Sequence, residues 1–221
     1  MVVLHHLENS RSQRVLWLME ELGVEYEVKR YQRHPKTMLA PDSLKAVHPL
    51  GKSPVITDEG KTIAESGAIV EYLVHTYGTP EMQIAADDPR WLDYCYWMHY
   101  AEGSVMPMMV MKLVFSQIEK APIIVRPIAK AISRQVMKTF VQPNIDRHLT
   151  YIDNHLAKSE WFVGDSLTGA DAQMIFPIEA AAARDQLPQR YPHVYAYMER
   201  IHQRPAYQRA LQRGGSYNLM G

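Results

Sequence analysis

The chain has 221 residues, of which 24 are Lys or Arg and 24 are Asp or Glu, so its formal net charge is zero. That balance argues against nucleic acid or an anionic membrane as the main partner, because both attract basic proteins. A single cysteine, Cys95, excludes a disulfide within the chain and fits a reducing compartment. The start Val2-Val3-Leu4 lacks a signal-peptide pattern, and no apolar run approaches the ~20 residues of a membrane span. We therefore expect a soluble, cytoplasmic protein.

The first 78 residues alternate between strand and helix patterns. Arg11–Leu22 carries apolar residues at helical spacing and is followed by Gly23, a common residue at helix ends. Ser53–Thr57 and Lys61–Ile63 flank a Glu59-Gly60 turn, which indicates a hairpin. The other predicted elements are strands at Val2–His5 and Glu25–Tyr31 and helices at Pro41–Val47 and Ser66–Tyr77. The order βαβαββα predicts a compact sheet covered by helices.

The rest of the chain shows helix patterns only. Residues 79–87 have no periodic pattern and contain a proline, so we expect a linker there. Asp88 and Pro89 suit the cap and the first turn of a helix. The predicted helices are Pro89–Phe115, with a kink at Pro107, and Pro127–His155, Ala170–Ala183 and His193–Gln203. We therefore predict an α/β domain at 1–78, a linker at 79–87 and an all-helical domain at 88–221.

Two short motifs point to a binding site. Pro54 stands at the head of a predicted strand, where it cannot donate to a neighbouring strand. The peptide bond between Ser53 and Pro54 can be cis, since cis peptide bonds in proteins occur mostly before proline. The backbone of Val55 is then available to a peptide-like ligand. Glu65 and Ser66 stand at a helix N-terminus, where they can hold an ammonium and a carboxylate together. Such a site recognises an α-amino acid.

Five segments carry a resemblance to a known family. They are Ser10–Leu18, His48–Val55, Ala64–Ile69, Leu167–Asp171 and Arg204–Tyr207. Through them nearly the whole chain resembles the cytosolic glutathione S-transferases, and among these the bacterial and fungal members with a serine-rich first turn. It lacks the tyrosine and the cysteine that other branches carry near the end of the first strand. The resemblance implies a thioredoxin-like first domain, an all-helical second domain with an electrophile site, and a homodimer.

The resemblance also implies how glutathione binds as co-substrate. Lys52 would bind its glycine carboxylate, and Glu65 and Ser66 would hold its γ-glutamyl end. Pro54 would start the strand from which Val55 offers its backbone N–H and C=O to the cysteinyl part. Further candidates lie in the loop after the second strand, and the sequence does not choose among His34, Lys36 and Leu39.

The sulfur of glutathione requires a donor, because a free thiol is mostly protonated at neutral pH and the thiolate is the nucleophile. Ser10 lies where this donor is expected, just ahead of the first helix. Asn9 takes the role if the motif is shifted by one residue, and Arg11 or Ser12 are further alternatives. The structural interpretation of Ser10 is a helix cap, since Ser10-Arg11-Ser12-Gln13 fits a capping box.

The second substrate is expected to be small and apolar, because one predicted helix is rich in methionine, an adaptable residue. These methionines are Met98, Met106, Met108, Met109 and Met111, although residues in such a pattern more often belong to the core. Thr168 and Asp171 fit a capping box with a structural role. Cys95 is expected to be buried and inert. We expect no metal, since the sequence contains no HExxH or comparable set of ligands.

These features favour a transferase that activates glutathione as thiolate and adds it to the electrophilic carbon of an apolar compound. A second hypothesis is glutathione-dependent reduction of peroxides or disulfides, which uses the same thiolate. A third is a non-enzymatic protein of the same fold that binds ligands or a partner. The combination of Lys52, Glu65 and Ser66 argues against the third, because such a role needs no affinity for glutathione.

Overall fold

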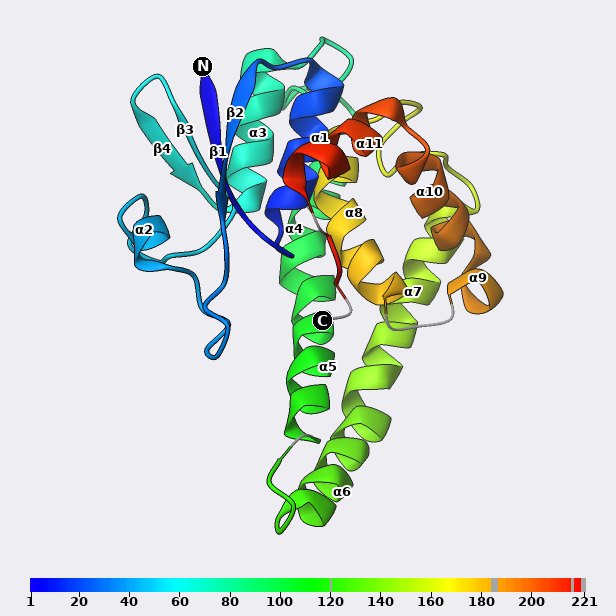
Figure 1. The fold of residues 1–221 in the computed structure, drawn as a ribbon. Helices are drawn as coiled ribbons and strands as arrows, with labels where there is room; N and C mark the ends of the chain where they lie inside the picture. The colour runs from blue at the N-terminus through cyan, green and yellow to red at the C-terminus, as the bar shows by residue number, and fades with distance from the viewer. Residues whose placement is uncertain (120, 184–186, 216, 220–221) are drawn as a thin grey trace.

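The computed structural model describes residues 1–119, 121–183, 187–215 and 217–219. Its first half holds a four-stranded sheet in the order β2-β1-β3-β4 (Figure 1). The strands are β1 (Val2–Leu7), β2 (Tyr26–Tyr31), β3 (Val55–Asp58) and β4 (Lys61–Ala64). β1 and β2 are parallel, whereas β1–β3 and β3–β4 are antiparallel. With α1 (Ser12–Leu22), α2 (Asp42–Lys45) and α3 (Ser66–Tyr77), this confirms the predicted βαβαββα order.

The head of β3 differs from the prediction by two residues. The strand begins at Val55 and not at Ser53. The Ser53–Pro54 peptide bond is cis, as the sequence suggested. Because proline has no N–H to donate, Ser53 and Pro54 stay outside the ladder and lie at the end of the sheet.

The second half is helical, and its described elements are more numerous than predicted. They are α4 (Trp91–Tyr100), η1 (Ala101–Val105), α5 (Met106–Ile118), α6 (Arg126–Val136), η2 (Met137–Val141), α7 (Gln142–Leu156), α8 (Gly169–Ala182), α9 (Leu187–Arg190), α10 (Pro192–His202) and α11 (Pro205–Gly214). The segments η1 and η2 are π-helical turns inside the two long predicted helices. The sequence analysis did not predict α9 or α11.

Helix α8 forms the centre of the molecule. All of its residues from Gly169 to Ala181 are buried, as expected of a helix that is apolar on every side. It packs against α4, α1, α3 and α10, so it joins the two halves of the chain. Its start is a capping box: Asp171 accepts hydrogen bonds from the backbone N–H and the hydroxyl of Thr168. The structure therefore confirms the structural role predicted for these two residues.

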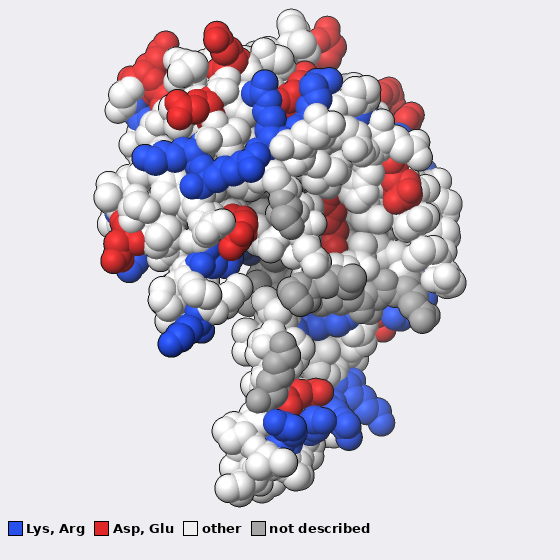
Figure 2. Space-filling model, viewed as in Figure 1, with Lys and Arg blue, Asp and Glu red and all other residues white. Residues whose placement is uncertain are grey.

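Helices α5 and α6 form an arm that extends from the body of the molecule (Figure 1). Apolar side chains remain exposed along it, including Ile123, Ile124, Ile128 and Ile132. Basic side chains gather on the same arm (Figure 2). Residues 106–141 contain six Lys or Arg and one acidic residue, whereas residues 79–105 contain one Arg and five acidic residues. The zero net charge therefore conceals a basic and an acidic region.

None of the helices formed by the described residues combines the length and the apolar character that crossing a bilayer requires.

Candidate functional site

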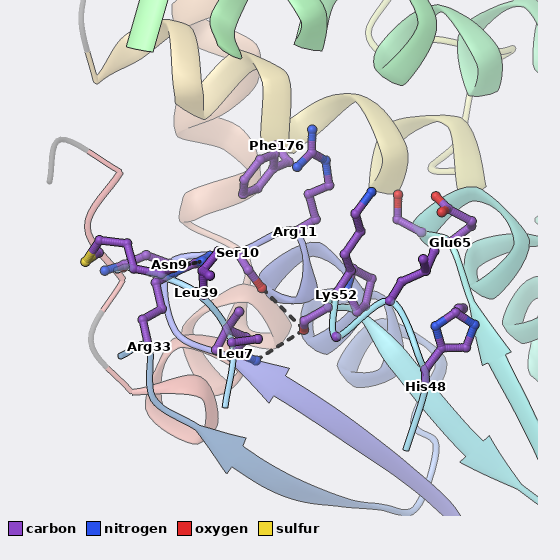
Figure 3. A pocket seen from close by; sticks show the side chains of 18 of the residues that line it. Leu7, Asn9, Ser10, Arg11, Arg33, Leu39, His48, Lys52, Glu65 and Phe176 are labelled. Atoms are coloured by element: carbon purple, nitrogen blue, oxygen red, sulfur yellow. Dashed lines mark hydrogen bonds between the residues drawn. The ribbon is translucent and has the colours of Figure 1, made fainter. Parts of the chain in front are cut away.

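A cleft of about 520 Å³ lies where the sheet domain meets the helical half. Its walls come from the β1–α1 loop, the β2–α2 loop, the segment before β3, the start of α3, and the helices η1 and α8. Figure 3 shows the side chains around it. They include Asn9, Ser10, Arg11, Arg33, Met38, Leu39, His48, Lys52, Ser53, Pro54, Glu65, Ser66, Glu102 and Phe176.

The cleft brings together most of the residues singled out from the sequence. Asn9 and Ser10 line it on the side of the β1–α1 loop, and Lys52, Pro54, Glu65 and Ser66 line it elsewhere. Of the residues left open, Arg11 and Leu39 also line it, whereas Ser12, His34 and Lys36 do not.

Val55 is placed differently from the other predicted site residues. It is fully buried, and it pairs with His5 on β1 and with Ala64 on β4. Val55 does not line the cleft, and the residue that does so at this point is Ser53. The cause is the late start of β3, which places Val55 inside the ladder and leaves Ser53 at its end.

Ser10 lies in a compact hydroxyl cluster. Its Oγ accepts the N–H of Ser12 at 3.2 Å, and it lies 2.8 Å from Ser12 Oγ and 3.4 Å from Ser53 Oγ. Ser53 Oγ in turn donates to the His5 carbonyl at 2.9 Å. The predicted capping box is not formed, because the buried amide of Gln13 has no hydrogen-bond partner among the described residues. Ser10 therefore faces the cleft from within a hydrogen-bonded network.

Glu65 and Ser66 occupy the start of α3. Glu65 has a positive φ of 70°, a sparsely populated conformation that is typical of functional sites. Ser66 Oγ accepts a hydrogen bond at 3.1 Å from Nε2 of Gln173 on α8. Since its oxygen is occupied in this way, the Ser66 O–H can donate to an anion at the helix N-terminus. Sequence reasoning did not find Gln173, because it lies 107 residues away.

An ion-paired cluster lies in the wall of the cleft. Glu102, in η1, contacts Arg11 Nε at 2.9 Å and the wholly buried Arg14 Nη2 at 2.5 Å. Burial alone would raise the pKa of Glu102, but Arg14 and then Arg11 outweigh it and hold the pKa below its usual range. The cluster keeps a guanidinium, that of Arg11, at the edge of the cleft. The sequence offered one sign of it, since Arg11 and Arg14 share a face of a buried helix that needs a carboxylate partner.

Comparison with known proteins decides the family. The family model for the glutathione S-transferase N-terminal domain matches residues 1–75, and that for the C-terminal domain matches residues 105–205. The chain belongs to the glutathione S-transferase family. Glutathione S-transferase 3 of Schizosaccharomyces pombe is 42% identical over 209 residues, covering 93% of this chain and 85% of the relative. On this basis the protein is a glutathione transferase.

Solved structures agree with that assignment. A glutathione S-transferase from Actinobacillus pleuropneumoniae is 31% identical, with a TM-score of 0.78 over 99% of this chain and 95% of its own. A glutathione transferase from Phanerochaete chrysosporium with oxidized glutathione shares the fold at 19% identity, with a TM-score of 0.75 over 96% and 94% of the two chains.

The methionines of the helical half follow the core interpretation and not the electrophile-site one. Met98, Met106 and Met109 are buried in the core, and Met108 and Met111 pack partly buried against it. None of these five lines the cleft, to which the helical half contributes Glu102 and Phe176.

Cys95 differs from its prediction as well, because it is only partly buried. Desolvation and then Glu71 raise the pKa of its thiol, which favours the protonated form. The described residues include no group of three or more His, Cys, Asp or Glu that could hold a metal ion.

Proposed function

We propose that this protein binds glutathione in the cleft and activates its thiol for attack on an electrophilic carbon of a small apolar compound. The observation that carries the proposal is the convergence of Lys52, Glu65 and Ser66 on one cleft with the β1–α1 loop. These groups match the charges of a γ-glutamyl tripeptide, which has an α-amino acid at one end and a carboxylate at the other.

Each end of glutathione has a partner in this proposal. The Ser66 O–H and the N-terminus of α3 hold the γ-glutamyl carboxylate, and Glu65 holds the neighbouring ammonium. Lys52 holds the glycine carboxylate. The backbone of Ser53, which lines the cleft, takes the part predicted for Val55 and pairs with the cysteinyl residue.

The thiolate is stabilised by the β1–α1 loop. Asn9 and Ser10 carry polar groups there, and Arg11 adds a positive charge fixed by Glu102. One hydrogen bond to a charged sulfur contributes about 1.5–3 kcal/mol, which lowers a thiol pKa by about one to two units. The apolar electrophile then lies against Phe176, Met38 and Leu39.

A second candidate function is the reduction of glutathione-containing disulfides. Two cations, Arg11 and Arg33, line the cleft in addition to Lys52. They could pair with the carboxylates of a second glutathione, and the Phanerochaete neighbour was solved with oxidized glutathione. The same thiolate would attack a sulfur in place of a carbon.

We also propose that the protein forms a two-fold homodimer. Leu92, Tyr96, Val110 and Val114 leave apolar side chains exposed on α4 and α5. In a two-fold pair, the acidic region 79–105 of one copy can face the basic region 106–141 of the other.

The test of the proposed function is calorimetric titration with reduced glutathione of the wild type, Glu65→Gln and the control Glu25→Gln. Glu25 is exposed and does not line the cleft. Its variant therefore removes the same charge at a position outside the site. We expect wild-type binding and a loss of affinity of about tenfold or more in Glu65→Gln only. A wild type that binds no glutathione, or two variants with equal affinity, would contradict the proposal. Conjugation of an apolar aryl halide, compared with reduction of a glutathione disulfide, separates the two candidate reactions.

A further inference from the structure

The end of the chain reaches the loop that would activate the thiol. Residues 214–215 and 217–219, here called the C-terminal segment, leave α11 and run beside α8 (Figure 1). The backbone N–H of Asn218 donates to Oδ1 of Asn9 at 2.7 Å. This contact joins positions 209 residues apart and involves one of the two candidate sulfur donors.

The C-terminal segment is fixed on α8. The Tyr217 hydroxyl donates to Oε2 of Glu179 at 2.5 Å. Glu179 is buried and also accepts hydrogen bonds from His202 Nε2, at 2.9 Å, and from the Tyr207 hydroxyl. A carboxylate held by three donors gives the tyrosine a rigid partner.

The start of the segment is fixed as well. A Cβ at Gly214 would lie 2.7 Å from Gln13 Oε1 and 2.9 Å from Leu16 Cδ1, so a larger residue would require these side chains on α1 to shift. Arg30 donates to the carbonyls of Gln212 and Arg213 at the end of α11. The amide of Asn218 therefore meets Asn9 from a backbone whose preceding residues are held at two points, on α1 with Arg30 and on α8.

His6 lies between the start of the segment and the hydroxyl cluster around Ser10. A Cβ at Gly214 would lie 3.5 Å from His6 Cε1, and His6 Nδ1 lies 2.8 Å from Ser12 Oγ. Burial, followed by Arg30, lowers the pKa of His6 to about 4, and the Gly214 backbone only partly offsets this. His6 is thus neutral at pH 7.

The Ser10 hydroxyl already has acceptors within the protein. Its O–H donates to Ser53 Oγ at 3.4 Å, and Ser12 Oγ lies 2.8 Å from the same oxygen. Ser53 and Ser12 in turn donate to the carbonyls of His5, at 2.9 Å, and Leu7, at 3.4 Å. Ser10 could donate to a bound sulfur only by giving up its place in this network.

Asn9, unlike Ser10, has a hydrogen-bond donor that no protein group occupies among the described residues. A backbone N–H can only donate, so the Asn9 atom that meets Asn218 is the amide oxygen. The Asn9 NH₂ group has no hydrogen-bond partner among the described residues. Asn9 is exposed and lines the cleft, with φ at +50°, a conformation that asparagine tolerates better than most residues.

We propose that the C-terminal segment makes Asn9, and not Ser10, the hydrogen-bond donor to the glutathione sulfur. It does so by occupying the Asn9 oxygen with the Asn218 N–H, which leaves the Asn9 NH₂ to donate, whereas the Ser10 O–H has acceptors within the protein. Asn9 is then the catalytic residue, whereas Asn218 and Tyr217 are positioning residues. The inference rests on the proposed activation of glutathione in this cleft.

The test is the pH titration of the bound glutathione thiolate by its ultraviolet absorbance in full-length variants. Asn218→Pro removes the N–H that holds Asn9, and Asn218→Ala is the matched variant that keeps it. We expect the bound thiol pKa of Asn218→Pro to lie about one unit above that of Asn218→Ala, with kcat/KM near neutral pH about tenfold lower. Glutathione affinity should differ between them by less than about threefold, because the groups that hold the two ends of glutathione are unchanged.

Two further comparisons keep the inference open to refutation if Asn218→Pro folds poorly. Asn9→Ala should raise the bound thiol pKa as Asn218→Pro does, and Ser10→Ala should raise it much less. A chain ending at Gly215 should behave like Asn218→Pro. Equal pKa values in the two Asn218 variants, or a rise in Ser10→Ala alone, would overturn the inference while wild-type binding upheld the proposed function. Absence of glutathione binding by the wild type would overturn the proposed function itself, and the inference with it.

Discussion

Buried ionisable residues surround the β1–α1 loop, and each is matched to a partner. Arg14 is wholly buried and donates both to Glu102 and to the Gln173 carbonyl. The helix that donates to Ser66 through Gln173 is therefore also tied to α1. His6 is 3% exposed and contacts Ser12. An unpaired buried charge is costly. The contacts that hold Arg14 and His6 therefore stabilise the fold and also fix the polar groups beside the cleft.

His6 gives a pH-dependent prediction. Its pKa is about 4 in the folded protein and 6.5 in an exposed chain. Between these two pH values His6 is protonated in the unfolded chain and neutral in the folded protein. The contribution of His6 to the free energy of unfolding is therefore fully present above pH 6.5 and is lost as the pH falls toward 4. The shift corresponds to about 3 kcal/mol.

Urea unfolding of the wild type and His6→Gln at several pH values measures this contribution. We expect His6→Gln to lose less free energy of unfolding than the wild type between pH 7 and pH 4. The exposed His193→Gln serves as the control and should follow the wild type. Parallel curves for the wild type and His6→Gln would contradict the prediction.

At the scale of elements, prolines explain where the long helices change. Pro107 follows η1 and Pro143 follows η2, each at the second position of the next α-helix. A proline ring collides with the carbonyl four residues earlier, and Gly103 and Thr139, at those positions, lie in the π-helical turns. Widening the helix to a π-turn accommodates the ring, and π-turns are frequent at functional sites. Here η1 carries Glu102 into the cleft.

The capping box of α8 carries the element-scale prediction. Asp171 accepts the backbone N–H groups of Phe162 and Thr168 and the hydroxyls of Thr168 and Tyr197. Asp171→Ala leaves these buried donors without their acceptor, and we expect it to cost about 3 kcal/mol. The exposed Asp165→Ala should leave the midpoint of urea unfolding nearly unchanged. A midpoint for Asp171→Ala equal to that of Asp165→Ala would show that the cap is dispensable.

At the scale of the whole molecule, the exposed apolar face of α4 and α5 predicts self-association. Val114→Glu places a charge on this face, where burial against a second copy would be costly. We expect the wild type to have twice the 25.4 kDa mass of the chain by light scattering, and Val114→Glu to shift toward the single mass. Ala157→Glu adds the same charge at the exposed end of α7 and should remain dimeric. A wild type of single-chain mass at high concentration would rule out the proposed dimer.

The sequence alone supported the βαβαββα order, the helical second half and the family. These depend on local patterns: apolar spacing, turn residues, and short motifs such as Pro54 and Glu65-Ser66. The same motifs led to most of the residues that line the cleft. Val55 was misplaced, and the methionines stayed open between the cleft and the core, for the same reason. A motif identifies a region, whereas the register of β3 and the packing of α4 and α5 decide which side chains face the cleft.

The tertiary structure alone decided which polar groups of the site donate, accept or pair with one another. Gln173 donates to Ser66 across 107 residues, Glu102 pairs with Arg14 across 88, and Asn218 donates to Asn9 across 209. No local pattern encodes these contacts, because each arises where α8, η1 or the C-terminal segment packs against the sheet domain. A hydrogen bond has a direction, and that direction follows from which donor the packing brings to which acceptor. The sequence could therefore name Asn9 and Ser10 as candidates, and only the folded chain could distinguish between them.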